Sequence, residues 1–158
     1  MKTWALGYAK AKQKAKEMYS AIGHVPCAAL GNELVAFTGI GFNHLVRKGR
    51  FPRTRTEQKK RFVLVPYIEQ MIKNPRAVIE YRRIEEKVVV DRHGEKMLVA
   101  SVAEFWTFVE RIDDCEVKVV IRQLDTGGPK HFFSVMADNV EIDNKPRART
   151  RIKKSRSK

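Results

Sequence analysis

The chain has 158 residues, 43% of them hydrophobic and 32% charged, with a formal net charge of +14 at pH 7. This length fits one domain with one core, and no stretch approaches the ~18 consecutive apolar residues of a membrane span. The N-terminus lacks the apolar segment and cleavage site of a signal peptide, so we expect a soluble protein. Cys27 and Cys115 are too few for a disulfide framework and are expected to be free thiols.

The charge excess makes polyanions the partners to consider: nucleic acid, an anionic membrane surface or an acidic protein. Eight cations lie in residues 145–158 with no acid among them, which leaves +6 for residues 1–144. That tail has little apolar surface to bury, so we expect a single domain, 1–144, followed by a flexible basic tail, 145–158. The tail would add sequence-independent attraction to phosphates; the alternative is a charge run that only aids solubility.

The N-terminal segment predicts a helix over residues 2–22, which Gly23 and Pro26 end. Its apolar residues recur at steps of four and three, and this spacing forms one helical stripe. They are Trp4, Tyr8, Ala11, Ala15, Met18 and Ile22. We expect the stripe to pack on the core, with lysines on the outer face. Residues 33–37 (ELVAF) then predict a short strand or an extended lead-in.

From Gly41 the sequence predicts a short helix that ends at Gly49. His44 and Lys48 are four residues apart and would share one helical face, with Arg47 beside them. Nearby cations oppose protonation of a histidine, so His44 should be neutral at pH 7, as a general base requires. The alternative is a histidine that only packs beneath the helix.

A further helix is expected after the turn at residues 50–56, with Thr56 as its cap and Glu57 in its first turn. Arg61 falls on one helical line with the apolar residues that follow it, so its guanidinium should point along the buried face toward a sheet. A half-buried guanidinium needs an anion, either a ligand phosphate or a distant carboxylate. Pro66 kinks this helix or starts another.

After residue 75 the pattern changes to strands and turns. Residues 102–112 fit a helix or a buried strand, and the strand is favoured because a hairpin turn follows. The other expected strands are 77–84, 87–90, 96–100, 116–124 and 130–136. The sequence therefore predicts an α+β fold, with N-terminal helices packed on one face of an antiparallel β-sheet of about four to five strands.

Polar residues interrupt the last two strands. Arg122 breaks an apolar run and Ser134 lies inside the returning strand, so both need partners. His131 and Ser134 are three residues apart and would face opposite sides of a regular strand. They line one site only if the strand contains a bulge, and the turn length leaves the register open. The alternatives are a Ser134 bonded to backbone and an exposed His131.

Motifs of other site classes are absent or weak. Gly39 and Gly41 do not extend to a nucleotide-binding loop. His24, Cys27 and the distant Cys115 make a poor zinc set. No carboxylate pair marks a hydrolase. We therefore predict chemistry that depends on cations, with no metal and no cofactor.

Four segments resemble the metal-independent ribonuclease toxins of the barnase, EndoU, colicin and RelE-like group, most closely its phage- and toxin-associated branch. They are GFNHLVRKG (41–49), EQKKRFVLVPYIEQMI (57–72), VKVVIRQ (117–123) and KHFFSVM (130–136), and the resemblance covers roughly residues 36–138. It implies an endoribonuclease in which a ribose 2′-hydroxyl attacks the neighbouring phosphate to give a 2′,3′-cyclic phosphate. The matching positions are His44, Lys48, Arg61, Arg122, Ser134 and His131.

These positions suggest separate roles. His44 would be the general base, while Arg61 and Arg122 hold the phosphate and offset charge in the transition state. Ser134 would orient a phosphate oxygen, and either Lys48 or His131 would protonate the leaving group. Further RNA phosphates would bind Arg47, Arg50, Arg53 and Lys130.

The expected partners follow from that activity. They are RNA, with tRNA or another structured RNA as the substrate, and an acidic antitoxin or immunity protein that occludes the cleft. The site of action would be the cytoplasm, reached either by a free-standing protein or by delivery within a larger toxin. The competing function is a non-catalytic basic RNA-binding module in which His44 is structural. A protein-interaction domain with an acidic partner is a third alternative.

Overall fold

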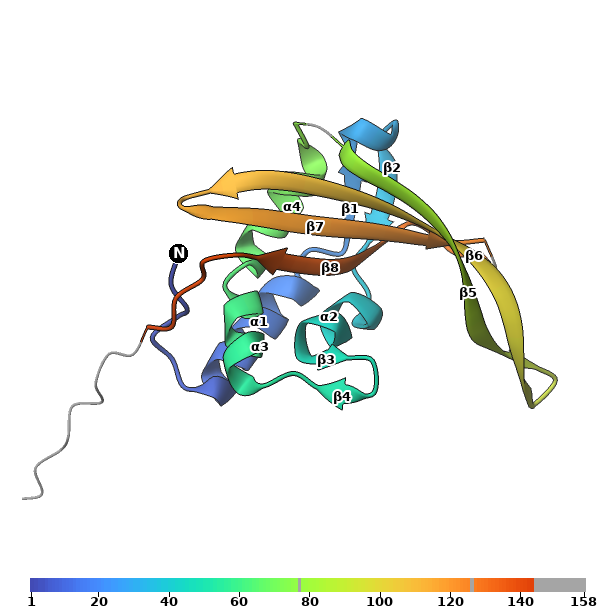
Figure 1. Ribbon diagram of the computed structural model, residues 1–158, viewed down its shortest axis with the longest axis horizontal. Helices are drawn as coiled ribbons and strands as arrows, with labels where there is room; N and C mark the ends of the chain where they lie inside the picture. The colour runs from blue at the N-terminus through green and yellow to red at the C-terminus, as the bar shows by residue number, and fades with distance from the viewer. Residues whose placement is uncertain (77, 126, 144–158) are drawn as a thin grey trace, which may run out of the picture.

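The computed structural model describes residues 1–76, 78–125 and 127–143, so the expected basic tail, 145–158, lies outside the described residues, as does position 144. Within them the fold is α+β, as predicted, with the helices packed against a curved sheet (Figure 1). The helices are α1 (Tyr8–Ser20), α2 (Gly39–Val46), α3 (Arg55–Phe62) and α4 (Val65–Lys73), and none of these is long and apolar enough to cross a membrane.

The main sheet of the described residues has six strands in the order β1-β2-β8-β7-β6-β5. They are β1 (His24–Cys27), β2 (Glu33–Ala36), β5 (Val78–Arg92), β6 (Glu95–Ile112), β7 (Cys115–Leu124) and β8 (His131–Ala137). A short 3-10 helix, η1 (Ala28–Leu30), joins β1 to β2, and a separate ribbon pairs β3 (Arg47–Lys48) with β4 (Phe51–Pro52).

The sheet is larger than the four to five strands expected, and it is mixed. Its pairs are antiparallel except β2 with β8, which are parallel through Ala36 and His131. The strand missed from the sequence is β1, because Pro26 reads as a helix stop. β1 lies at the edge of the sheet, where a proline removes no hydrogen bond from the ladder.

Helix α1 begins at Tyr8 instead of residue 2, because the residues before it pair with the C-terminal segment of the domain. The backbone N–H of Thr3 donates to the carbonyl of Glu141 at 2.8 Å. The apolar stripe of helix α1 packs inward as predicted, with Ala11 and Ala15 fully buried.

The helix expected after residue 56 is two helices. The cap of α3 is Thr54, whose Oγ1 accepts a hydrogen bond from the backbone N–H of Glu57 at 3.2 Å, so Thr56 is not the cap. Helix α4 starts at Val65 with Pro66 in its first turn, where a proline displaces no helical hydrogen bond. The break leaves Arg61 on α3, while the apolar side of α4 is buried.

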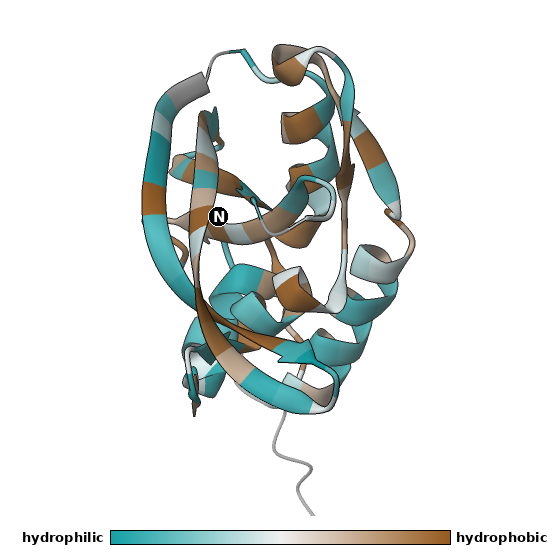
Figure 2. Ribbon diagram, turned by 90° about the vertical axis from the view of Figure 1, so that its right-hand side faces the viewer, coloured by the Kyte–Doolittle hydropathy of each residue, from teal (hydrophilic) through white to brown (hydrophobic). Residues whose placement is uncertain are grey.

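Strands β5 and β6 are each longer than expected. The stretches predicted as separate strands on either side of residues 85–86 form one strand, β5, and those on either side of residue 101 form β6. Residues 102–112 are therefore strand, as favoured. The outer parts of β5 and β6 project beyond the other strands (Figure 1), and the strands carry both hydrophilic and hydrophobic stretches (Figure 2).

The two faces of the sheet bury separate apolar clusters. Val119 and Ile121 of β7 belong to the main core, which the helices cover. The intervening Val120 points to the other face, where it joins a smaller cluster with Ala103 and Phe105. Both cysteines are buried in the main core and are free thiols, as expected.

Candidate active site

A bulge in β8 places polar residues on the face of the sheet that carries the smaller cluster. The pairing with β7 shifts at Phe133, which becomes the extra residue of the bulge. On one side of the bulge Ser134 lies opposite Val120, and on the other side His131 lies opposite Arg122. Because Val120 and Arg122 are two residues apart on β7, His131 and Ser134 face the same side of the sheet. This is the bulge that a shared site requires.

Arg122 and His131 hydrogen-bond to each other across the two strands. Arg122 Nε donates to His131 Nε2 at 3.0 Å, so this nitrogen is an acceptor and carries no proton. Burial, followed by the positive charge of Arg122, lowers the pKa of His131, while a hydrogen bond to the backbone of Pro129 raises it. His131 is therefore placed to orient Arg122. The predicted role of His131 as proton donor does not fit this geometry.

Phe133 joins the strand to helix α2. Its ring centroid lies 4.4 Å from Arg122 Cζ, which is a cation–π contact, and 4.0 Å from the ring centroid of His44. Phe105 supports the same ring in an edge-on contact at 5.4 Å. One aromatic ring thus positions both His44 and Arg122.

Helix α2 approaches β8 closely because residue 41 has no side chain. A Cβ at Gly41 would lie 2.4 Å from Tyr19 Oη and 2.7 Å from the carbonyl oxygen of Phe132. Only glycine fits at such a distance. His44 follows one helical turn later, so the glycine brings His44 next to β8.

His44 is half-buried, and its ring nitrogens make no hydrogen bond to any of the described residues. Burial is the largest cause that lowers its pKa, and the positive charges of Arg122, Arg53, Arg61 and His131 lower it further. The predicted direction is therefore found, but its causes differ. Helix α2 ends at Val46, so Lys48 lies in β3 and does not share a helical face with His44.

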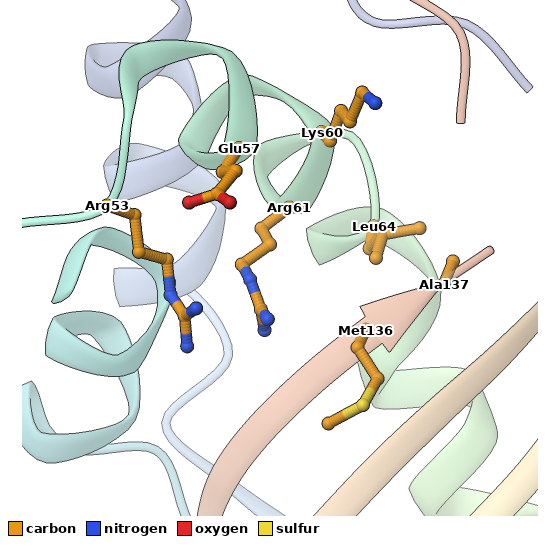
Figure 3. A pocket seen from close by; sticks show the side chains of 7 residues that line it. All are labelled: Arg53, Glu57, Lys60, Arg61, Leu64, Met136 and Ala137. Carbon is orange, nitrogen blue, oxygen red and sulfur yellow. The ribbon is translucent and has the colours of Figure 1, made fainter. Parts of the chain in front are cut away.

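Arg53 and Arg61 line a cavity of about 160 Å³ next to the end of β8, and their guanidinium groups point the same way (Figure 3). Arg61 Nη1 donates to the carbonyl of Val135 at 2.6 Å, so Arg61 reaches the sheet as expected. Burial and then the charge of Arg53 lower the pKa of Arg61 to about 10, while Glu57 raises it.

Neither of these two arginines forms an ion pair with a carboxylate within residues 1–76, 78–125 and 127–143. Lys60 adds a third cation to the lining of this cavity and Glu57 a single carboxylate, so the cavity has a positive balance that favours the binding of an anion (Figure 3). The distant carboxylate considered for Arg61 is therefore not found among the described residues, and the observed partner of Arg61 is the carbonyl of Val135.

Arg53 connects this cavity to His44. Its guanidinium lines the cavity, and its Nε donates to the backbone carbonyl of His44 at 3.0 Å. The His44 side chain lines a second cavity of about 250 Å³, together with Asn43 and Arg47. The base candidate and the two arginines thus line two neighbouring cavities, which the hydrogen bond of Arg53 to the His44 backbone connects.

Several predicted residues lie elsewhere. Lys48 is exposed on β3. Its side chain points to the opposite face of the ribbon from that of Arg47, which lines the second cavity. Arg50 is exposed in the β3–β4 turn. Lys130 is buried, forms an ion pair with Glu33 and lies 4.9 Å from the ring centroid of Trp106, so it is not available to phosphate.

Ser134 faces the right side of the sheet but is only 6% exposed, which leaves no room for a phosphate oxygen. Two residues were undervalued from the sequence. The sequence does not point to Phe133, because only the bulge in β8 brings its ring to this face of the sheet. Arg53 was expected only as a remote phosphate ligand, and no spacing rule links it to His44. In the described part of the chain, no group of three His, Cys, Asp or Glu side chains could hold a metal ion.

Comparisons with known proteins identify no relative: no protein family model, no curated protein and no solved structure matches this chain.

Proposed function

We propose that this protein is a metal-independent endoribonuclease in which a ribose 2′-hydroxyl attacks the neighbouring phosphate and leaves a 2′,3′-cyclic phosphate. The observation that carries the proposal is the convergence of a neutral, half-buried His44 with Arg53, Arg61 and Arg122. A binding surface needs only exposed cations. A half-buried, unprotonated histidine among arginines is an arrangement that suits proton removal next to a phosphate.

His44 is the general base. Its lowered pKa keeps the imidazole unprotonated at pH 7, and its ring nitrogens have no hydrogen-bonding partner among the described residues. The proton of the 2′-hydroxyl moves to His44 as the 2′-oxygen forms a bond to phosphorus and the bond from phosphorus to the 5′-oxygen breaks. Phe133 holds the ring in place during this transfer.

The arginines stabilise the charge that develops on the phosphate. Arg61 uses one donor on Val135; Arg122 uses Nε on His131, and its Nη1 lies 3.9 Å from a carboxylate oxygen of Glu86. Each guanidinium has five N–H donors, so both retain further donors for phosphate oxygens, and a phosphate at Arg122 would compete with Glu86. These donors are fixed before the substrate binds, which is the condition for large transition-state stabilisation. The leaving 5′-oxygen takes its proton from solvent, because His131 is an acceptor and Lys48 lies outside the cluster.

The second candidate function is a non-catalytic RNA-binding module, in which His44 only packs against Phe133. The close contact of the two rings, 4.0 Å between centroids, is the observation that favours it. In either function RNA is the partner, and an acidic inhibitor protein would bind the same arginines. The ribonuclease would act in the cytoplasm.

Cleavage of total RNA in excess EDTA separates the two functions. We expect products with 2′,3′-cyclic phosphate ends from the wild-type protein, a loss of at least about 100-fold in His44→Gln, and normal cleavage by the control His24→Gln, which changes an exposed histidine. Arg61→Met should also lose activity. RNA binding without cleavage would favour the module.

A further inference from the structure

The β3–β4 ribbon presents an aromatic side chain to solvent beside the candidate active site. Phe51 is 76% exposed, more than any other large hydrophobic side chain in the described residues. The ribbon lies next to α2, at the lower edge of the molecule in Figure 1. At this exposure the Phe51 side chain contributes little to the core, and its ring is free to contact a partner.

The turn of the ribbon holds this side chain outward. Lys48 lies opposite Phe51, so Gly49 and Arg50 are the two loop residues. Gly49 has a φ of 62°, while Arg50 is not among the residues with positive φ, which is the pattern of a type II′ hairpin turn. Pro52 follows Phe51 and stiffens the return strand. The aromatic ring is therefore carried by a short, defined hairpin.

The charge of the ribbon favours a polyanion as its partner. Residues 47–53 contain Arg47, Lys48, Arg50 and Arg53 and no acid. A single exposed aromatic ring among cations matches the way proteins hold unpaired nucleotides, with the ring stacked on a base and the cations on phosphates. In a duplex the bases are stacked on one another and are not available to such a ring.

The ribbon also adjoins the reactive group. Arg47 and Gly49 line the same 250 Å³ cavity as His44, and the backbone N–H of Arg53 donates to the carbonyl of Val46 at 2.8 Å. A strand that enters this cavity at His44 would leave it along the ribbon. Phe51 pairs with Lys48 and shares its face of the ribbon, opposite to that of Arg47, so the strand would pass over the edge of the ribbon to stack its next base on Phe51.

We propose that the β3–β4 ribbon is a single-strand clamp, in which Phe51 stacks on an unpaired base that flanks the cleavage site. This inference rests on the proposed ribonuclease function and deepens it, because it restricts the substrate to RNA that is unpaired at the cut. The ribbon takes part in RNA binding only and not in the chemical step.

The test measures binding to RNA that cannot be cut. Kd is measured by fluorescence anisotropy, at one fixed salt concentration, for a labelled 2′-O-methyl single strand and for its blunt duplex. We expect the wild-type protein to prefer the single strand. Phe51→Ala should weaken single-strand binding about 5- to 150-fold and leave duplex binding unchanged. Phe51→Trp, which keeps an aromatic ring, should retain the preference for the single strand, whereas Phe51→Leu should lose it as Phe51→Ala does.

Leu34→Ala, which truncates another exposed apolar side chain, is the matched control and should bind as the wild type does. Arg50→Gln should weaken both ligands equally. The inference is overturned if Phe51→Ala binds the single strand normally or loses both ligands equally, or if Phe51 governs binding to phosphatidylserine vesicles instead. Because the probe has no free 2′-hydroxyl, an inactive enzyme would not affect this test, and a failed clamp would leave cleavage by His44 intact.

Discussion

Replacing Gly41 by alanine should destabilise the fold by displacing helix α2 from the sheet. A Cβ at this position would lie 2.4 Å from Tyr19 Oη, 2.5 Å from Phe132 Cδ1 and 2.7 Å from the Phe132 carbonyl oxygen. Ordinary contacts begin at 3.4 Å, so the nearest atom is 1.0 Å too close. The Phe132 side chain is fully buried, and its carbonyl belongs to β8, so neither can move aside cheaply.

The size of the effect follows from two opposing contributions. Overpacking of a core by one methyl group costs about 1–3 kcal/mol, and a clash with backbone belongs at the upper end. Alanine in a helix returns roughly 0.5–1 kcal/mol relative to glycine. The free energy of unfolding should therefore fall by about 2 kcal/mol. In a chain of this length that corresponds to roughly 4–8 °C in Tm.

Gly39→Ala is the matched control, because it lies in the same helix and its Cβ would meet no atom within 4 Å. Urea unfolding of both variants, followed by circular dichroism, gives the comparison. We expect Gly39→Ala to be as stable as the wild type or slightly more stable. If Gly41→Ala matched Gly39→Ala, the close approach of α2 to β8 would be refuted, and with it the placement of His44.

Three further predictions concern the cap, the histidines and the orientation of Arg122. Thr54→Ala should lower the free energy of unfolding by about 1 kcal/mol, whereas Thr56→Ala, at the cap position expected from sequence, should change it by less than about 0.5 kcal/mol; equal losses would contradict the assigned cap. The pKa values of His44 and His131 are lowered in the folded state, so the unfolded chain binds more protons as pH falls below about 6.5, and stability should decrease from pH 7 to pH 5. This decrease, measured by urea unfolding, should be smaller in His44→Gln and His131→Gln than in His24→Gln. If the free energy of unfolding had the same pH dependence in all three variants, the lowered pKa values of His44 and His131 would be contradicted. His131→Gln keeps an acceptor for Arg122 and should retain most RNA cleavage, while His131→Phe should lose about tenfold, which corresponds to one hydrogen bond of about 1.4 kcal/mol; equal losses would indicate that His131 itself donates a proton.

Local patterns predicted the parts of this fold that depend on neighbouring residues. The stripe of α1, the strand pattern of β7 and the α+β class depend on periodicity, which a single segment carries by itself. The N-terminus of α1 was misplaced because Thr3 pairs with Glu141, a contact between distant parts of the chain. β1 was missed for a similar reason, since a proline is acceptable there only because the strand is at the edge.

The candidate site was predictable in its members and less so in its connections. His44 and Arg61 were identified from their spacing and burial pattern, and both lie in the arrangement. The sequence could not show that Lys130 is buried against Glu33, because its partner is 97 residues away. Nor could it show that the bulge at Phe133 brings His131 next to Arg122, because a bulge depends on the pairing of two strands.

Whether this protein is a metal-independent ribonuclease is tested by the cleavage of a defined single-stranded RNA by purified protein in excess EDTA, with the new ends identified by mass spectrometry. The proposed mechanism predicts 2′,3′-cyclic phosphate and 5′-hydroxyl ends from the wild-type protein, and no cleavage when the sugar at the cut is 2′-deoxyribose or when His44 is replaced by Gln. Intact RNA after incubation with the wild-type protein, or undiminished cleavage by His44→Gln, would contradict it.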